Sequence, residues 1–349
     1  MKRFIALLLV IIMATSLVAC GGKTTEPKPD ASNTGSGDEG KIYKIVYANT
    51  VPDSNPQAIY AKYMAERMKE LSGGRLQMTV YNNNQLGDFV SCFNQMQING
   101  TVQMGDVSSA SITSASTLFT PFSLPFLFKS KEQSFNYFDN SETIKKIEEE
   151  FVKETNVRVL GYFYNDARAL TNSKRAVSKP DDCKGLKLRV MQSDVYIKTF
   201  EALGASPISM SFSELFTALQ QKNVDGQDNG LILTMDSKFN EVQKYFTDLN
   251  HVQDTSVIFI SEDFWKSLPE DLQQIIQQAV DEAVEKEREE YAKRLDSYME
   301  ELKKTVEVTI LTDEQRAAFK EKCKPVYEWY KETYPQYDLD AIMADIEKY

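Results

Sequence analysis

Residues 42–81 read IYKIVYANTVPDSNPQAIYAKYMAERMKELSGGRLQMTVY and contain one complete strand–helix–strand unit. β-Branched and aromatic residues at 42–48 favour a strand. Asn55 followed by Pro56 is typical of a helix start, because asparagine caps well and proline loses no hydrogen bond there. Gly73-Gly74 supplies the left-handed ending of that helix, and alternating apolar residues in 75–81 predict the next strand. The unit indicates an α/β fold.

The same alternation continues along the chain, and it predicts a largely parallel sheet covered by helices, in two such units. We expect helices at about 88–99, 134–154, 193–203 and 211–221 and strands near 102 and at 157–164, 186–190 and 205–208. The stretch from Pro269 to about Lys304 has no glycine and no internal proline. A helix of that length approaches about 50 Å, so it either breaks or runs across two lobes.

The first forty residues are typical of a bacterial lipoprotein. Lys2 and Arg3 precede an apolar run that is too short to span a bilayer, as in a secretory signal. Leu17-Val-Ala-Cys20-Gly is similar to a lipobox, so we expect a signal peptide at 1–19 and lipid on Cys20. Residues 20–40 are polar and predict a flexible tether. The chain is then extracytoplasmic and anchored to the cell membrane; the alternative is a plain signal peptide with a chance cysteine.

Composition excludes several classes of function. The formal net charge of −11 disfavours nucleic acid, whose binding needs a basic surface. Cys92, Cys183 and Cys323 have no CxxC spacing, and His251 is the only histidine. We therefore expect no metal and no cofactor, and we interpret the cysteines as buried apolar residues and His251 as structural.

Three stretches taken together resemble one family. They are Gly73–Leu76 with Gln85–Asp88, the run Leu118–Phe128, and the segments Gly185–Val190, Ala202–Pro207, Leu219–Gln221 and Val224–Asn229 followed by Glu241–Tyr245 and His251. Their order and spacing are similar to those of DctP-type solute-binding proteins of tripartite ATP-independent periplasmic (TRAP) transporters. The resemblance covers about residues 41–335.

The resemblance implies a two-lobe periplasmic-binding-protein-like fold. Each lobe would be a mixed sheet covered by helices, with a long helix spanning both lobes. Lobe I would comprise 41–166 and about 254–295, and lobe II 167–253 and about 296–349. Such proteins are not enzymes; they capture a small organic anion between the lobes and deliver it to a membrane permease. We expect a monomer.

Three residues are the main candidates for ligand binding. Arg189 lies near the carboxyl end of a predicted strand, where ligands of α/β sheets collect, and its guanidinium can hold a carboxylate with two hydrogen bonds. The resemblance implies the same role for Asn229, in a loop after Asp225-Gly226, and a cleft-facing position for Arg168. Where the family tends to have glycine, this chain has Asp166, a further candidate that could accept hydrogen bonds from sugar hydroxyls.

Weaker candidates lie in the other lobe or on the pocket wall. They are Asn49, Asn55, Gln85 and Asp88, each of which we interpret more readily as a cap or turn residue, and Tyr164 and Phe212, which are also plausible core residues. We interpret 119–128 as a buried crossing segment; the alternative is an exposed patch for the membrane partner.

Other functions remain open at this level. A ligand-sensing lipoprotein that works with a membrane kinase would share the same fold and residues. A secreted hydrolase is less favoured, since the chain has no GxSxG motif and its single histidine has no evident partner. C4-dicarboxylates, hexuronates, sialic acid and aromatic or keto acids all fit one arginine; Asp166 and the asparagines favour hydroxylated sugar acids.

Overall fold

The strand–helix–strand unit expected at 42–81 is present in the structure, a computed structural model that describes residues 40–349. It consists of β1 (Tyr43–Ala48), α1 (Pro56–Leu71) and β2 (Leu76–Tyr81), and β1 pairs with β2 in parallel. The Asn55 side chain accepts a hydrogen bond from the Gln57 N–H at 3.0 Å, as a helix cap does. The expected signal peptide and Cys20 lie outside the described residues.

The remaining elements continue the alternation of strands and helices. The other strands are β3 (Met104–Ser108), β4 (Val157–Ala167), β5 (Ala169–Asn172), β6 (Lys187–Val190), β7 (Ser206–Ser209), β8 (Gly226–Asn229), β9 (Tyr245–Thr247), β10 (Gln253–Ser261) and β11 (Glu307–Thr309). The other helices are α2 (Phe89–Gln97), α3 (Ser109–Ile112), α4 (Lys131–Asn140), α5 (Glu142–Thr155), α6 (Asp194–Ala202), α7 (Phe212–Gln220), α8 (Leu231–Asp236), α9 (Glu262–Ser267), α10 (Glu270–Leu302), α11 (Asp313–Lys322), α12 (Lys324–Thr333) and α13 (Leu339–Ile346). Short 3₁₀ turns occur at Thr117–Ser123, Pro180–Cys183 and Phe239–Glu241.

The strands form two sheets, which confirms the two-lobe fold. One sheet has the order β2-β1-β3-β10-β4 and the other β11-β9-β5-β8-β6-β7; we call them sheet A and sheet B. Helices pack on both faces of sheet A, and successive strand residues point to opposite faces. In β10, Ile258 and Ile260 pack with α1 and α10, whereas Val257 and Phe259 pack with α2 and α5.

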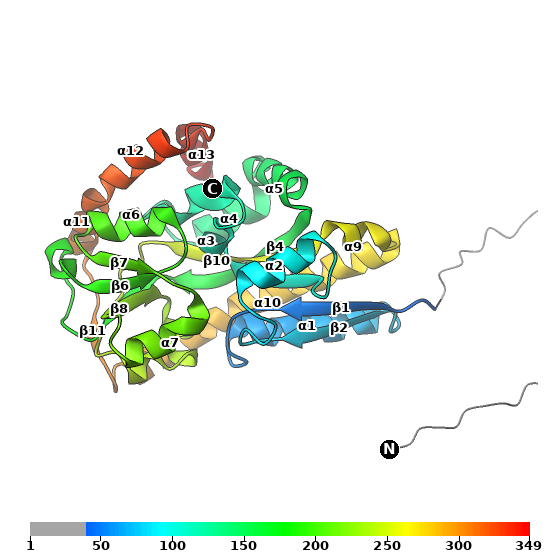
Figure 1. Ribbon diagram of the computed structural model, residues 1–349, viewed down its shortest axis with the longest axis horizontal. Helices are drawn as coiled ribbons and strands as arrows, with labels where there is room; N and C mark the ends of the chain where they lie inside the picture. The colour runs from blue at the N-terminus through cyan, green and yellow to red at the C-terminus, as the bar shows by residue number, and fades with distance from the viewer. Residues whose placement is uncertain (1–39) are drawn as a thin grey trace, which may run out of the picture. The chain divides into compact units, whose positions relative to one another are not determined.

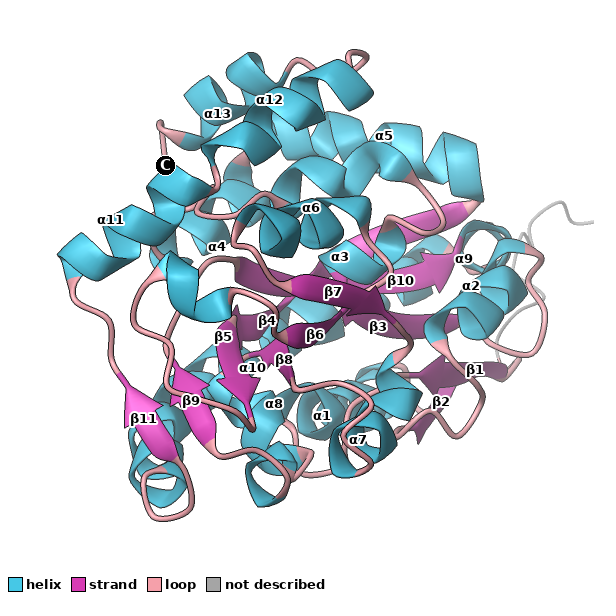
Figure 2. Ribbon diagram, turned by 60° about the vertical axis from the view of Figure 1, so that its left-hand side comes forward, coloured by secondary structure: helices cyan, strands magenta, loops and turns pink. Residues whose placement is uncertain are grey.

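Two crossing strands connect the sheets and make both of them mixed (Figures 1 and 2). The chain runs from β4 in sheet A to β5 in sheet B with only Arg168 between them, and it returns from β9 to β10. Because β4 and β10 run in opposite directions, they pair antiparallel, as do β5 and β9. The prediction of largely parallel sheets was therefore wrong, since a chain that crosses and returns must pair with itself in antiparallel fashion.

The long helix α10 spans both lobes, as the resemblance implied. In Figure 1 it runs from α9 at one end of the described fold to β11 at the other. Its first half, including Ile276 and Val280, packs in the core of sheet A, and Leu302 at its end packs with Phe246 of sheet B. At 33 residues it has the length expected from the sequence.

The helix predicted over 134–154 is instead two helices. Ser141 ends α4 and caps α5, with its hydroxyl accepting from the N–H groups of Thr143 and Ile144. A serine hydroxyl competes with helical backbone bonding, so the chain turns there. Phe119 and Phe122 of the 119–128 run are buried in the core beside α4 and α5.

The C-terminal helices return across the fold. Val326 and Tyr330 of α12 pack with α6, while Ile342 and Ile346 of α13 pack in the core beside α4 and α5. Figure 2 shows α12 and α13 along the same side as α5 and α6. None of the helices within residues 40–349 is both long and apolar enough to cross a membrane.

Candidate functional site

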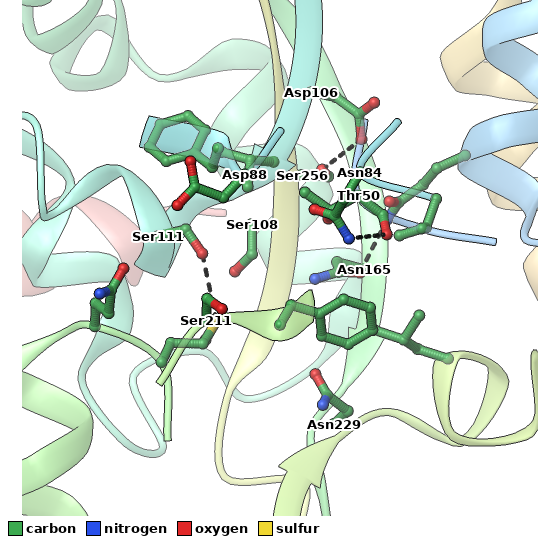
Figure 3. A pocket seen from close by; sticks show the side chains of 18 of the residues that line it. Thr50, Asn84, Asp88, Asp106, Ser108, Ser111, Asn165, Ser211, Asn229 and Ser256 are labelled. Atoms are coloured by element: carbon green, nitrogen blue, oxygen red, sulfur yellow. Dashed lines mark hydrogen bonds between the residues drawn. The ribbon is translucent and has the colours of Figure 1, made fainter. Parts of the chain in front are cut away.

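A pocket with a cavity volume of about 70 Å³ lies between the two sheets. Figure 3 shows Asp106 and Asn229 reaching toward it from opposite sides. Its wall is built from strand ends and the loops and helix starts that follow them. The lining residues are Thr50, Val51, Gln57, Asn84, Asp88, Phe89, Val90, Asp106, Val107, Ser108, Ser111, Asn165, Arg168, Arg189, Met191, Gln192, Met210, Ser211, Phe212, Asn229, Leu233 and Ser256.

Arg189 lines this pocket with part of its guanidinium unused. Nε and Nη2 both donate to the carbonyl oxygen of Met210, at 3.0 and 2.9 Å. Nη1 is buried and has no hydrogen-bond partner among the described residues. Burial lowers the pKa of Arg189 to about 10, an effect that Asp228 opposes and Arg168 reinforces. Nη1 and the second hydrogen of Nη2 thus remain available as a pair of donors.

Arg168 also lines the pocket, but most of its donors are occupied. Nε donates to Asp228 Oδ2 at 3.0 Å and Nη1 to Asp254 Oδ2 at 2.7 Å, while Nη2 bonds the Asp228 carbonyl and Asn229 Oδ1. Burial alone would lower the pKa of Arg168, but Asp228, Tyr196 and Asp254 raise it above its ordinary value. Asp228 belongs to sheet B and Asp254 to sheet A, so Arg168 links the two sheets where the chain crosses between them.

Asn229 and His251 belong to the surroundings of Arg168. Asn229 lines the pocket; its Oδ1 accepts from Arg168 at 3.0 Å and its Nδ2 donates to Gln227 Oε1 at 2.5 Å. His251 is buried, with Nδ1 3.2 Å from the Arg168 carbonyl and Nε2 3.3 Å from Asp228 Oδ2. The histidine therefore contacts Arg168 and Asp228 and does not line the pocket.

The weaker candidates divide into two groups. Asp88 and Phe212 line the pocket, and Asn49 borders a smaller adjoining cavity that shares Asp88 and Asp106 with it. Asn55 and Gln85 lie outside the pocket lining, Asn55 as the cap of α1 and Gln85 on an exposed loop.

Asp166 and Tyr164 also lie outside the pocket lining. Asp166 has a left-handed backbone (φ 69°), and its carboxylate accepts from the N–H groups of Ala167 and Ile232. Burial raises its pKa to about 6. Tyr164 packs edge-on against Phe135 and Tyr291. Asp166 thus orders the start of α8, and Tyr164 contributes to packing.

Several polar residues of the wall were missed by sequence reasoning. Gln57, Asn165, Ser108 and Ser256 line the pocket, as does Asp106 in the middle of β3. Only Asp106 offered a signal, because it is a carboxylate in the middle of a strand whose residues are all buried. An ionisable side chain is rarely buried without a structural or functional role. The serines carried no such signal, because serine is common in turns and helix caps.

The described residues contain no group of three or more His, Cys, Asp or Glu side chains placed to hold a metal. Cys92, Cys183 and Cys323 are buried and unpaired. Two α/β lobes joined by crossing strands, with a polar pocket between them, define the class of two-lobe solute-binding proteins.

The chain belongs to the DctP family, described as bacterial extracellular solute-binding protein family 7, whose model matches residues 47–333. It is 32% identical over 306 residues to the C4-dicarboxylate-binding periplasmic protein DctP of Shewanella loihica, covering 87% of this chain and 90% of that protein. It is therefore a TRAP-type extracytoplasmic solute-binding protein, in a family that serves transport.

Solved structures support the same assignment. The sugar acid binding protein DctPAm from Advenella mimigardefordensis, in complex with galactonate, is similar with a TM-score of 0.84 and 33% identity, covering 88% of this chain and 99% of that one. A TRAP periplasmic solute binding protein from Sulfurospirillum deleyianum, with bound succinate, gives a TM-score of 0.81 at 29% identity over 88% and 99% of the two chains.

Proposed function

We propose that this protein captures a small organic anion by its carboxylate, with Arg189 as the main binding residue, and delivers it to TRAP membrane permease subunits. This proposal rests on the buried guanidinium of Arg189, whose Nη1 has no hydrogen-bond partner among the described residues. A buried charge without a counter-ion is costly, so a ligand that supplies one is favoured. Galactonate and succinate, named for the two similar structures, both carry a carboxylate.

The geometry of the unused donors supports a two-point contact. Nη1 and the free hydrogen of Nη2 form the outer end of the planar guanidinium, which matches the two oxygens of a carboxylate. Each hydrogen bond to a charged group contributes roughly 1.5–3 kcal/mol. Losing both should weaken binding about a hundredfold or more. Asn229 is positioned by Arg168 and is proposed to contribute a further contact from the same wall.

Titration calorimetry of Arg189→Ala and Arg189→Lys tests this proposal. Both variants should lose affinity for every ligand that the unaltered chain binds, Arg189→Ala by about a hundredfold or more and Arg189→Lys by at least about tenfold. Arg67→Lys is the control, because Arg67 pairs with Glu282 on α10 outside the pocket lining. Unchanged affinity in Arg189→Ala, with a normal thermal melt, would contradict the proposal.

Lipidation of Cys20 is proposed as the anchor that keeps the protein near its permease. Support comes from the lipobox-like sequence before Cys20 and the polar tether after it. Labelling cells with a radioactive fatty acid should mark the protein and should fail with Cys20→Ala. Equal labelling of the unaltered protein and of Cys20→Ala would contradict lipidation of Cys20.

A further inference from the structure

The charged residues of the pocket are distributed unequally between its two walls. Arg168 and Arg189 lie on the crossing and sheet B side, whereas Asp88 and Asp106 come from sheet A and the helix that follows β2. These four are the charged side chains that line the pocket. Arg168 already contacts two carboxylates, Asp228 and Asp254. Arg189 is thus the cation left for a ligand, and the opposite wall carries negative charge.

Asp106 is held rigidly on that opposite wall. Its Oδ1 accepts from the Tyr47 hydroxyl at 2.7 Å, and its Oδ2 accepts from the Ser256 hydroxyl at 2.8 Å. Both donors are neutral and lie on strands of sheet A next to β3. No ion pair among the described residues includes Asp106. A carboxylate accepts about four hydrogen bonds, so one acceptor position stays free even when Asn49 also donates to Asp106.

We propose that Asp106 is a specificity-determining residue that restricts this pocket to acids with one carboxylate and a hydroxylated chain, by accepting a hydrogen bond from a ligand hydroxyl and repelling a second carboxylate. This inference rests on the proposed function, since it needs the first carboxylate to be bound at Arg189. It assigns selectivity to a residue in the opposite lobe from the arginine.

The physical basis is the difference between a donor and an acceptor facing Asp106. A hydroxyl donates to an ionised carboxylate in a charge-assisted hydrogen bond, which is about twice as strong as a neutral one. A second carboxylate has no proton to donate, and like charges at close range in a buried site repel strongly. Ser108, Ser256 and Asn165 on the same wall are further partners for hydroxyl groups.

Titration of Asp106 gives the proposal a second signature. Burial raises the pKa of Asp106 to about 6, although hydrogen bonds from Tyr47, Ser256 and Asn49 lower it. Glu287 on α10 also interacts with Asp106, and Asp88 is the other carboxylate of this wall. Asp106 is therefore ionised at pH 8 and protonated at pH 5. The protonated group donates a hydrogen bond, so the discrimination against dicarboxylates should weaken as the pH falls.

The test is calorimetry of the purified chain at pH 8 against aldonates and hexuronates, including galactonate and glucuronate, and against succinate, fumarate and malate. We expect the tightest ligand to be a hydroxylated monocarboxylate. Asp106→Asn replaces one carboxylate oxygen with a hydrogen-bond donor. The affinity for that ligand should fall about tenfold or more, and the ratio of its affinity to that of succinate should become smaller. Asp248→Asn is the control, because Asp248 pairs with Arg316 outside the pocket lining.

The possible outcomes separate this inference from the proposed function. The role of Asp106 would be overturned if a dicarboxylate bound the unaltered chain more tightly than every hydroxylated monocarboxylate. If that dicarboxylate no longer bound to Arg189→Lys, the proposed carboxylate site at Arg189 would still be supported. An unchanged ligand preference in folded Asp106→Asn would also overturn the role of Asp106. If that variant does not fold, the unaltered chain decides: the advantage of the hydroxylated acid over fumarate, whose second carboxyl stays largely ionised at pH 5, must shrink between pH 8 and pH 5.

Discussion

At the scale of single residues, the two arginines of the pocket have different tasks. Arg168 donates to two carboxylates, an amide oxygen and a carbonyl, from the point where the chain crosses between sheets. Arg189 donates to one carbonyl and keeps the outer end of its guanidinium unpaired. The same side chain is thus mainly a structural link in one position and the proposed ligand-binding group in the other.

This difference predicts that the two arginines contribute unequally to stability. Arg168→Ala leaves Asp228 and Asp254 buried without their shared guanidinium, so it should lower the free energy of unfolding by about 3–5 kcal/mol. Arg189→Ala removes an unpaired buried charge and should cost clearly less. Urea unfolding of the two ligand-free variants checks this. A larger loss of stability in Arg189→Ala than in Arg168→Ala would contradict the assignment.

At the scale of elements, the pocket depends on how closely strands β5 and β8 approach. β8 carries Asp228 and Asn229, and it begins at Gly226. A Cβ atom on Gly226 would lie 2.0 Å from the Thr171 carbonyl oxygen on β5, far inside contact distance. Glycine is therefore required there because a neighbouring backbone occupies the space, which fits its place in the Val224–Asn229 motif.

Gly226→Ala should consequently separate β8 from β5. We expect a loss of about 1–3 kcal/mol or more in the free energy of unfolding, since overpacking forces the backbone to shift. Ligand affinity should fall as well, because Asn229 moves with the strand. Gly161→Ala is the matched control, as its Cβ would meet only side-chain tips, Val280 at 3.1 Å and Val284 at 3.6 Å. Thermal melts and calorimetry of both variants test this; equal effects would show that the close approach is unimportant.

At the scale of the whole molecule, ligand binding is proposed to favour closure of the two lobes about the crossing strands. One contact between the lobes lies outside the pocket lining: the exposed Ser54 hydroxyl donates to Asp236 Oδ1 at 2.9 Å, and Tyr298 of α10 donates to the same atom. Ser54 follows β1 of sheet A, whereas Asp236 ends α8, which follows β8 of sheet B. The contact stabilises the arrangement in which the lobes meet.

Ser54→Ala should therefore lower the affinity for all ligands by the same factor. One net hydrogen bond contributes about 0.5–1.5 kcal/mol, which corresponds to about two- to tenfold in affinity. The ratio between hydroxylated acids and dicarboxylates should not change, because Ser54 does not line the pocket. Calorimetry with one ligand of each kind measures both quantities. A change of preference without a general loss would rule out a role in closure.

Much of the fold could be predicted from local patterns. The limits of β1, α1 and β2 agree with the 42–81 reading to within a residue, because periodicity, caps and glycine endings act within a few residues of each other. The break at Ser141 was missed, since a serine inside a helical pattern only sometimes turns the chain. The mixed sheets implied by the family resemblance are confirmed, whereas the strand–helix alternation alone predicted largely parallel pairing, because strand direction depends on where the chain crosses.

The sequence by itself determined the order of elements, the family, and the placement of Arg189 near the end of a strand. The loop expected at Asn229 was wrong, because Asn229 is the last residue of β8. Only the tertiary structure decided which donors remain free. Asp228 and Asp254 lie 60 and 86 residues from Arg168 along the chain, and folding brings both against its guanidinium. The same folding places Asp106 opposite Arg189 in one pocket. Charge pairing between distant residues follows from the closure of the fold, and no local pattern encodes it.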